Sequence, residues 1–419
     1  MYSSYCFSKK MLMNISLYVI LISIIGFSNS GSGFLYLPEV FDSFSTLLMM
    51  SSLLIAFLIA FSSQIKVNMI LLMGFLFHII IVILSLLSNK VDVFGTVYRL
   101  NVSIIPFFMI VISSYISKYE EAEEILNRIL SMFTIWLSLQ TIGTVLTTYY
   151  QNGILLKKEM AVSIGGSNFI AALLLVCVTY FLLLPKKENS KKHKVVFLFG
   201  FIGLVFTFSF GSIVTFILIV YLYYLTQKKA TLTMVLISVF VFGIVIMLYN
   251  GLLVEMFSNT VFNDFIYKAT FKIQQISLGN YDAAFAGRGA VYKSKLELIT
   301  EKVILGYGTN VESAGQIRSH NWILDSLIYT GVIGTFLYLF LIGYLLIKIR
   351  KGRHLINNGN SAYFALIAGI IHGFIEPNFF SKPFDFIWWL LALVTFYSIE
   401  SNDQNNRNQK FVTIQEIVK

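Results

Sequence analysis

Charged residues and cysteines are scarce in this sequence. Only 12% of its 419 residues are charged, against 57% that are hydrophobic, and this balance excludes an ordinary soluble domain of this length. The two cysteines, Cys6 and Cys177, lie in or beside apolar stretches, so neither a disulfide framework nor a metal site is indicated. The composition indicates an integral membrane protein.

Motifs for nucleotides and metals are also missing. The sequence has no P-loop, no glycine-rich dinucleotide fingerprint after a strand, no Asp-x-Asp pair and no metal-type His/Cys spacing. We therefore expect no cofactor and no metal, and a nucleotide-sugar donor is disfavoured. Acidic residues are nearly absent from the predicted span interiors, where ion-coupled transporters keep their coupling groups, and this weakens a transporter interpretation.

The net charge of +10 raises the question of nucleic-acid binding. The basic residues are confined to loops between apolar stretches, where they set the orientation of a membrane protein. No nucleic-acid partner is therefore expected.

Apolar runs of roughly 15 to 25 residues dominate the chain and predict membrane-spanning helices rather than barrel strands. The expected fold is all-α and polytopic. The charge-free segment 195–225 lies between two basic loops, so it should cross twice and turn near Ser209–Ser212, with Gly211 in the tight reversal. This gives about 12 spans, with both termini in the cytoplasm. The other spans are expected at about 11–28, 45–63, 69–88, 101–117, 129–149, 167–184, 231–250, 322–347, 361–376 and 384–400.

The chain divides into four parts: transmembrane helices over 1–250, a long external loop over 251–321, further transmembrane helices over 322–400, and a polar cytoplasmic tail over 401–419. Within the loop, apolar positions at helical spacing predict a short helix over residues 290–304, with its lysines, Lys293 and Lys295 among them, on a solvated face. Because scaffolded loops concentrate binding and catalytic residues, we expect any chemistry here.

Four short motifs follow one another through the loop and into the next span: Gly287-Arg288, Gly306-Tyr307-Gly308, His320-Asn321 and Gly331-Val332-Ile333-Gly334. In this order and spacing they resemble the O-antigen ligase and O-antigen polymerase superfamily of bacterial envelope glycosyltransferases. Upstream, Asn168 at the start of a span adds to the resemblance, which the motifs support over about residues 163–347. One departure is Gly211-Ser212-Ile213, where many members have Ser-Arg, so another cation would have to serve.

The resemblance implies an undecaprenyl-diphosphate-linked oligosaccharide as donor. It also implies transfer of the glycan to an acceptor hydroxyl at the outer face of the bacterial cytoplasmic (inner) membrane, among membrane lipids. A flippase and a chain-length regulator are the protein partners that it suggests. Transfer to another lipid-linked repeat unit would make the protein a polysaccharide polymerase. The alternatives are a ligase that moves finished glycan to another acceptor, and a non-enzymatic flippase or exporter.

Arg288 and Arg318 are candidates to hold the diphosphate, because guanidinium groups are permanent, multidentate donors to phosphate. With these cations no metal is required. His320 is the candidate base for the acceptor hydroxyl, since imidazole titrates near neutrality, and Trp322 is expected to anchor its span at the interface. Further candidates for substrate contact at the external face are Arg99, Tyr307, Asn321, His372 and Glu376.

The arginines, His320 and Asn321 also have a structural interpretation. Arg288 would be solvated or paired with Asp282, and Arg318 and Arg99 would reach toward lipid headgroups. His320 or Asn321 would cap the next helix.

Overall fold

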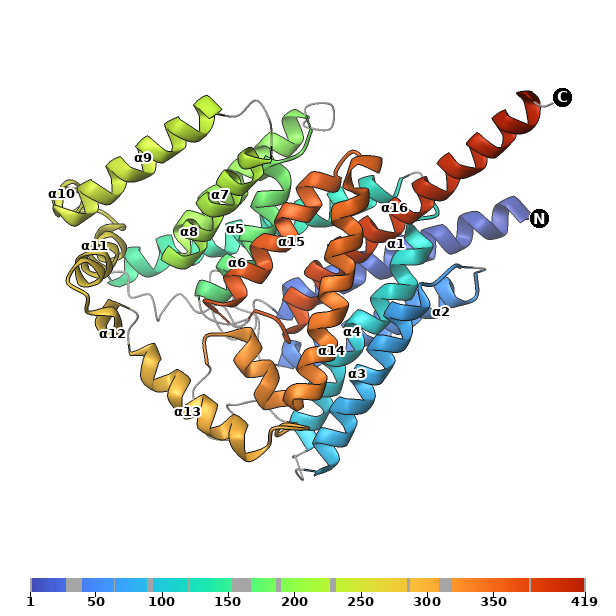
Figure 1. The fold of residues 1–419 in the computed structure, drawn as a ribbon, viewed down its shortest axis with the longest axis horizontal. Coiled ribbons are helices and arrows are strands. Elements are labelled where there is room, and N and C mark those ends of the chain that lie inside the picture. The colour runs from blue at the N-terminus through green and yellow to red at the C-terminus, as the bar shows by residue number, and fades with distance from the viewer. Residues whose placement is uncertain are drawn as a thin grey trace.

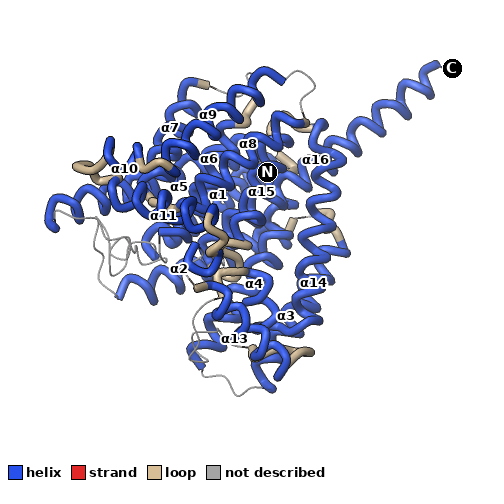
Figure 2. The backbone as a smooth tube through the Cα atoms, turned by 60° about the vertical axis from the view of Figure 1, so that its left-hand side comes forward, coloured by secondary structure: helices blue, strands red, loops and turns tan. Residues whose placement is uncertain are grey.

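The computed structural model describes residues 2–27, 40–63, 65–88, 93–119, 121–152, 167–185, 190–226, 231–284, 287–308, 319–376 and 378–417. Within these ranges the chain is helical and contains no strand, as Figure 2 shows. The all-α prediction is confirmed. A helix suits the predicted environment, because all of its backbone hydrogen bonds close within one segment and none has to be made to lipid.

Every predicted span overlaps a helix (Figure 1). The helices in this group are α1 (Tyr2–Phe27), α2 (Val40–Phe61), α3 (Met69–Ser88), α4 (Val93–Ile116), α5 (Ala122–Asn152), α6 (Ser167–Leu182), α7 (Lys191–Phe206), α8 (Phe210–Leu225), α9 (Thr231–Tyr249), α14 (Trp322–Gly352), α15 (Gly359–Gly373) and α16 (Lys382–Ile417). The shorter elements are α10 (Leu252–Met256), α11 (Asn263–Ser277), α12 (Tyr281–Ala284), α13 (Arg288–Glu301) and the 3-10 turn Arg353–Leu355.

By length and composition, four of the described helices are able to cross a membrane: Met69–Ser88, Ala122–Tyr150, Trp322–Leu355 and Lys382–Asn406. Others, such as Phe210–Leu225, are apolar but shorter. The structure therefore supports a polytopic helical membrane protein, and the count of twelve crossings stays a prediction.

The core lies around α6, α15 and α16. Every residue of α6 from Phe169 to Phe181 is buried, so this helix is covered on all sides. Trp388 and Trp389 of α16 pack at right angles to each other in the same core. Trp322, expected as an interfacial anchor, is also a core residue: it is 1% exposed and its ring lies 4.6 Å from that of Phe379. The anchor interpretation is wrong, because aromatic neighbours enclose the indole.

Segment 195–225 forms two helices, as predicted, but the turn between them differs from the prediction. Phe208 takes the left-handed conformation, with φ at 50°, and its ring packs on those of Phe262 and Phe265. Gly211 lies inside α8. A Cβ atom there would come within 2.9 Å of the Ile375 side chain, so Gly211 allows close packing on the end of α15 and does not form the turn.

Helices α10 to α13 occupy the predicted long loop and are strung along the left and lower edge of the bundle in Figure 1. The helix expected over residues 290–304 is confirmed as α13. The tail after residue 400 is polar, as predicted, but it continues α16 to Ile417, since neither Gly nor Pro interrupts it.

Helix α14 breaks at Gly331, where φ is 63° and ψ is −168°. The break frees backbone carbonyls, and the turn after α13 bonds to them: the amide of Tyr307 donates to Ile328 O at 2.7 Å and that of Gly308 to Tyr329 O at 2.9 Å. Such partners are what a broken helix needs away from water.

Three glycines make possible this attachment of the turn after α13 to the break in α14, which we call the clamp. Gly306, Gly308 and Gly331 all have positive φ, and a Cβ atom on any of them would meet backbone atoms within 2.7 Å. The Gly306-Tyr307-Gly308 motif and the motif that begins at Gly331 therefore act together, because they attach the end of α13 to the break in α14.

We predict that Gly331→Ala lowers the free energy of unfolding by about 3 kcal/mol, because the new Cβ is strained and meets Ile304 O at 2.2 Å. Gly343→Ala, in the same helix with open space around the added atom, is the control and should not lower it. Thermal unfolding of both variants in detergent measures the difference. Equal midpoints would show that the clamp tolerates a side chain.

Candidate functional site

His320 and Glu376 form the centre of the candidate site. His320 Nδ1 lies 3.0 Å from Glu376 Oε2, and the side-chain amide of Asn168 donates to the same oxygen at 3.2 Å. His320 is 33% exposed and Glu376 only 16%. An imidazole that donates from Nδ1 to a carboxylate keeps its Nε2 as a proton acceptor, so the pair has the arrangement of an oriented base.

The backbone around His320 is held in place by its neighbours. His320 takes a left-handed conformation, with φ at 57°, directly before α14. On its two sides, the amide of Ser319 donates to Asp325 Oδ1 at 3.3 Å, and Asn321 Oδ1 caps α14 by accepting from the amides of Ile323 and Leu324. Left-handed non-glycine residues are uncommon and concentrate at functional sites.

Asn321 thus has the capping role that was one of its two interpretations. Its side-chain oxygen is occupied by two backbone amides, which are the orphan donors of a helix start. Substrate contact by Asn321 stays a prediction.

Arg288 reaches the same corner from α13. It follows Gly287, which has φ at 71° and forms the start of the helix, and its Nη1 donates to Ile375 O at 3.2 Å. Ile375 precedes Glu376 in the chain, so Arg288 contacts the backbone of the segment that carries the His320–Glu376 pair. Within the described residues Arg288 forms no ion pair with Asp282, the structural alternative that the sequence allowed.

His372 lies behind the pair, in the core. Its side chain is fully buried, and a 2.7 Å hydrogen bond joins its Nε2 to Ser212 Oγ, which in turn lies 2.9 Å from Ser209 Oγ. The chain of contacts ties the end of α15 to the start of α8. Contact of His372 with substrate stays a prediction.

Tyr307 is separated from these residues. It follows the 14-residue helix α13, which at about 1.5 Å per residue puts it roughly 20 Å along the chain from Arg288. Its hydroxyl donates to Glu301, and Lys302 Nζ lies 4.8 Å from its ring centroid. Burial and the nearby Glu301 raise the pKa of Tyr307 to about 12. The structure therefore does not bring Tyr307 to the His320–Glu376 pair.

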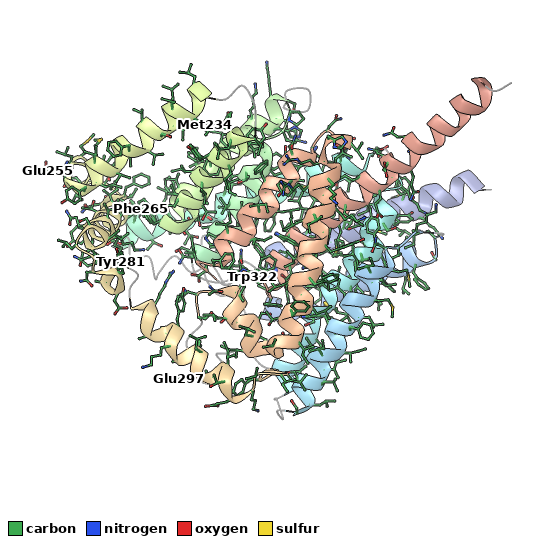
Figure 3. The ribbon with its side chains drawn as sticks, viewed as in Figure 1. Met234, Glu255, Phe265, Tyr281, Glu297 and Trp322 are labelled. Carbon is green, nitrogen blue, oxygen red and sulfur yellow. The ribbon has the colours of Figure 1, made fainter. Side chains whose placement is uncertain are left out.

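Two candidates fall outside what the structure describes. Arg318 precedes the first described residue of this segment, and the side chain of Arg99 is not described, although α4 contains its backbone. Figure 3 places Trp322, two residues after His320, near the middle of the view, with Glu297 of α13 at the lower edge.

Lys295 corrects one interpretation of α13. It was expected on a solvated face, yet it is 1% exposed. Burial lowers its pKa, and the charge of Asp325 acts in the opposite direction. Asp325 also accepts from Ser319 beside the site, so the charge that acts on Lys295 of α13 belongs to the start of α14. The helical spacing of α13 carries no sign of this, because the partner lies 30 residues away by chain position.

The geometry assembles a carboxylate-oriented imidazole and a half-buried guanidinium at one corner of the bundle. An imidazole of this kind is able to take a proton from a hydroxyl, and a guanidinium is able to neutralise a phosphate leaving group. Asn168, Ser212 and Asp325 complete the surroundings. In the sequence, Asn168 belongs to the family resemblance and Ser212 to the departure from it, whereas Asp325 carries no signal.

Comparison with known families agrees with the motifs. Residues 195–339 match the family model described as O-antigen ligase, and this segment contains Arg288 and His320 but ends before Glu376. None of the curated proteins matches the chain. The family match confirms the resemblance to the O-antigen ligase and polymerase superfamily that the sequence motifs indicated.

We predict that Asn321→Ala weakens the start of α14 by about 1 kcal/mol, because the amides of Ile323 and Leu324 lose their acceptor. Hydrogen exchange of peptides covering residues 319–330 should then speed up. Asn321→Asp keeps a capping oxygen and should exchange as the parent does. Unchanged exchange in Asn321→Ala would argue against the cap.

Proposed function

Starting from the match of residues 195–339 to the O-antigen ligase family, we propose that this chain is a membrane glycosyltransferase that acts as a polysaccharide polymerase. It transfers a glycan from undecaprenyl diphosphate to a hydroxyl of another lipid-linked repeat unit, at the outer face of a bacterial cytoplasmic membrane. The observation that carries the proposal is the meeting of His320, Glu376 and Arg288 at one corner of the helical bundle.

In this reaction His320 acts as the base. Its Nε2 takes the proton of the acceptor hydroxyl while the hydroxyl oxygen forms a bond to the anomeric carbon of the donor. Glu376 accepts a hydrogen bond from Nδ1, which orients the ring and stabilises the imidazolium that forms. Glu376 therefore acts through His320 and is a positioning residue.

The bond from the anomeric carbon to the diphosphate oxygen breaks in the same step, and its electron pair leaves with the diphosphate. Negative charge grows on this leaving group, and Arg288 stabilises it from the neighbouring position on Ile375. A permanent cation performs the neutralisation that metal ions provide in other phosphate chemistry, so the proposed route needs no metal.

A lipid-carried donor fits the surroundings of the site. The outer helices expose large apolar side chains, Phe240 and Phe242 of α9 among them, as expected of surfaces that face acyl chains. The carrier tail then stays in the bilayer while the diphosphate reaches the ends of the helices. A ligase would use the same residues with a different acceptor, so the product distinguishes the two.

We predict that the purified protein in lipid converts a synthetic undecaprenyl-diphosphate repeat unit into a ladder of products with repeat-unit spacing, and that a chelator leaves the ladder unchanged. His320→Ala and Arg288→Ala should each lower the rate by at least about 10²-fold, since each removes a group that acts in the transition state. Gel analysis of labelled products is the measurement.

Lys293→Ala, an exposed substitution on the same helix as Arg288, is the matched control and should keep parental activity. Transfer of one intact glycan to a different acceptor, with no ladder, would identify a ligase. Unaltered substrate under all conditions would refute the enzyme proposal.

We also predict that Glu376→Gln lowers kcat by about 10²-fold with KM changed less than about 3-fold, because the amide no longer stabilises the imidazolium. Initial rates at varied donor concentration separate the two constants. Glu301→Gln, which alters the carboxylate beside Tyr307 at the far end of α13, should leave kcat as in the parent. A change in KM alone for Glu376→Gln would assign Glu376 to substrate binding instead.

A further inference from the structure

Lys272 lies beside the candidate site on an element that none of the sequence motifs includes. It belongs to α11, whose residues Ile266 and Ala269 pack with Leu248 and Phe210 in a small core of their own. The Lys272 side chain is half-buried, and its Nζ lies 5.8 Å from the centroid of the Phe210 ring. The ammonium is therefore held over the first residue of α8.

A continuous series of contacts connects Lys272 with Arg288. Phe210, under the ammonium, precedes Gly211, and Gly211 packs so closely on Ile375 that a Cβ atom would lie 2.9 Å from that side chain. The carbonyl of Ile375 accepts from Arg288. Lys272 and Arg288 thus approach the corner between α8 and α15 from two different elements of the long loop.

The two cations act on each other electrostatically. Burial lowers the pKa of Lys272, and the charges of Arg288 and Lys268 lower it further. Bringing positive charges together and partly out of water is unfavourable unless an anion balances them.

Within the described residues, no carboxylate forms an ion pair with Lys272 or Arg288. Asp264 pairs with Lys268, which lies one turn before Lys272 on α11, and Glu376 pairs with His320. The carboxylate of Asp282 lies near Gly289, beside Arg288, but forms no ion pair with Arg288. No ion pair among the described residues therefore neutralises Lys272 or Arg288.

We propose that Lys272 is a second cation for the lipid-linked diphosphate, binding one phosphate while Arg288 binds the other. The inference rests on the proposed function and names a residue of its donor site. A diphosphate presents two anionic groups a few ångströms apart, and one guanidinium serves as a planar, multidentate donor while an ammonium serves as a compact point charge. Lys272 makes no covalent bond and is a binding residue.

The position of α11 suits a ligand that arrives along the membrane. Helix α11 exposes Tyr267, Phe271 and Ile276, and is amphipathic, as is typical of helices lying at the membrane interface. A helix at that interface would hold its ammonium at headgroup depth. An anionic phospholipid headgroup offers the same phosphate chemistry, so the experiment has to separate the two sources.

The test is equilibrium binding of labelled undecaprenyl diphosphate to the full chain in nanodiscs of neutral lipid. Lys272→Met keeps the aliphatic stem over Phe210 and removes the charge, and we expect binding to weaken by at least about 10-fold, as for loss of one charge-assisted contact. Lys272→Arg should stay within about 3-fold of the parent. Lys268→Met, whose ammonium is already paired with Asp264, should bind as the parent does.

Parental affinity in Lys272→Met would overturn the proposal. An equal loss in Lys268→Met would also overturn it, since the effect would then come from general surface charge. In nanodiscs with anionic phospholipid, the difference between Lys272→Met and the parent should persist. Its disappearance would assign Lys272 to bulk headgroups.

Binding requires no turnover, so the two proposals fail separately. A parent that binds the diphosphate lipid with Lys272-dependent affinity but forms no product refutes the proposed function alone. A parent that forms the ladder while Lys272→Met binds normally refutes the role of Lys272 alone. Absence of binding by the parent contradicts the diphosphate site.

Discussion

The last residues of α15 and the turn after it hold the candidate site together. His372 bonds to Ser212 of α8, and the carbonyl of Ile375 accepts a hydrogen bond from Arg288 at the start of α13. The Glu376 carboxylate bonds to His320, just before α14, and accepts a hydrogen bond from Asn168 of α6. A largely buried carboxylate is costly unless it is paired and hydrogen-bonded, so Glu376 requires its partners as much as it orients them. The position of His320 and that of Arg288 thus depend on one short segment.

Helix α13 is fastened at both ends, and this explains why glycines far from the site matter to it. One end is held by Arg288 on Ile375, and the other by Gly306 and Gly308 against the break at Gly331. Between the two ends, Lys295 is buried. A long loop without these attachments would have many conformations, so the clamp holds α13, and Arg288 with it, against α14 and Ile375.

Much of the fold could be predicted from the sequence, because apolar runs without charges specify helices locally. The turn at Phe208 could not, since its left-handed backbone is supported by the rings of Phe262 and Phe265, at the start of α11 and more than fifty residues later in the chain. The same distinction holds for the site. His320 and Arg288 carry local motifs, whereas the pairing of His320 with Glu376 joins residues 56 positions apart and leaves no local pattern. The burial of Lys295 and the approach of Lys272 to Phe210 likewise depend on tertiary packing.

In the candidate site, the chemistry depends more on which partner each charged side chain has than on the number of charges. Arg288 donates to the neutral carbonyl of Ile375, the residue before Glu376 in the chain, while the Glu376 carboxylate pairs with His320. A salt bridge between Arg288 and Glu376 would neutralise the cation and leave the imidazole without its acceptor.

Because the carbonyl of Ile375 orients the guanidinium of Arg288 without cancelling its charge, the full positive charge stays available to an anion. Separating the two roles in this way suits a step in which a hydroxyl loses its proton on one side while negative charge develops on the other.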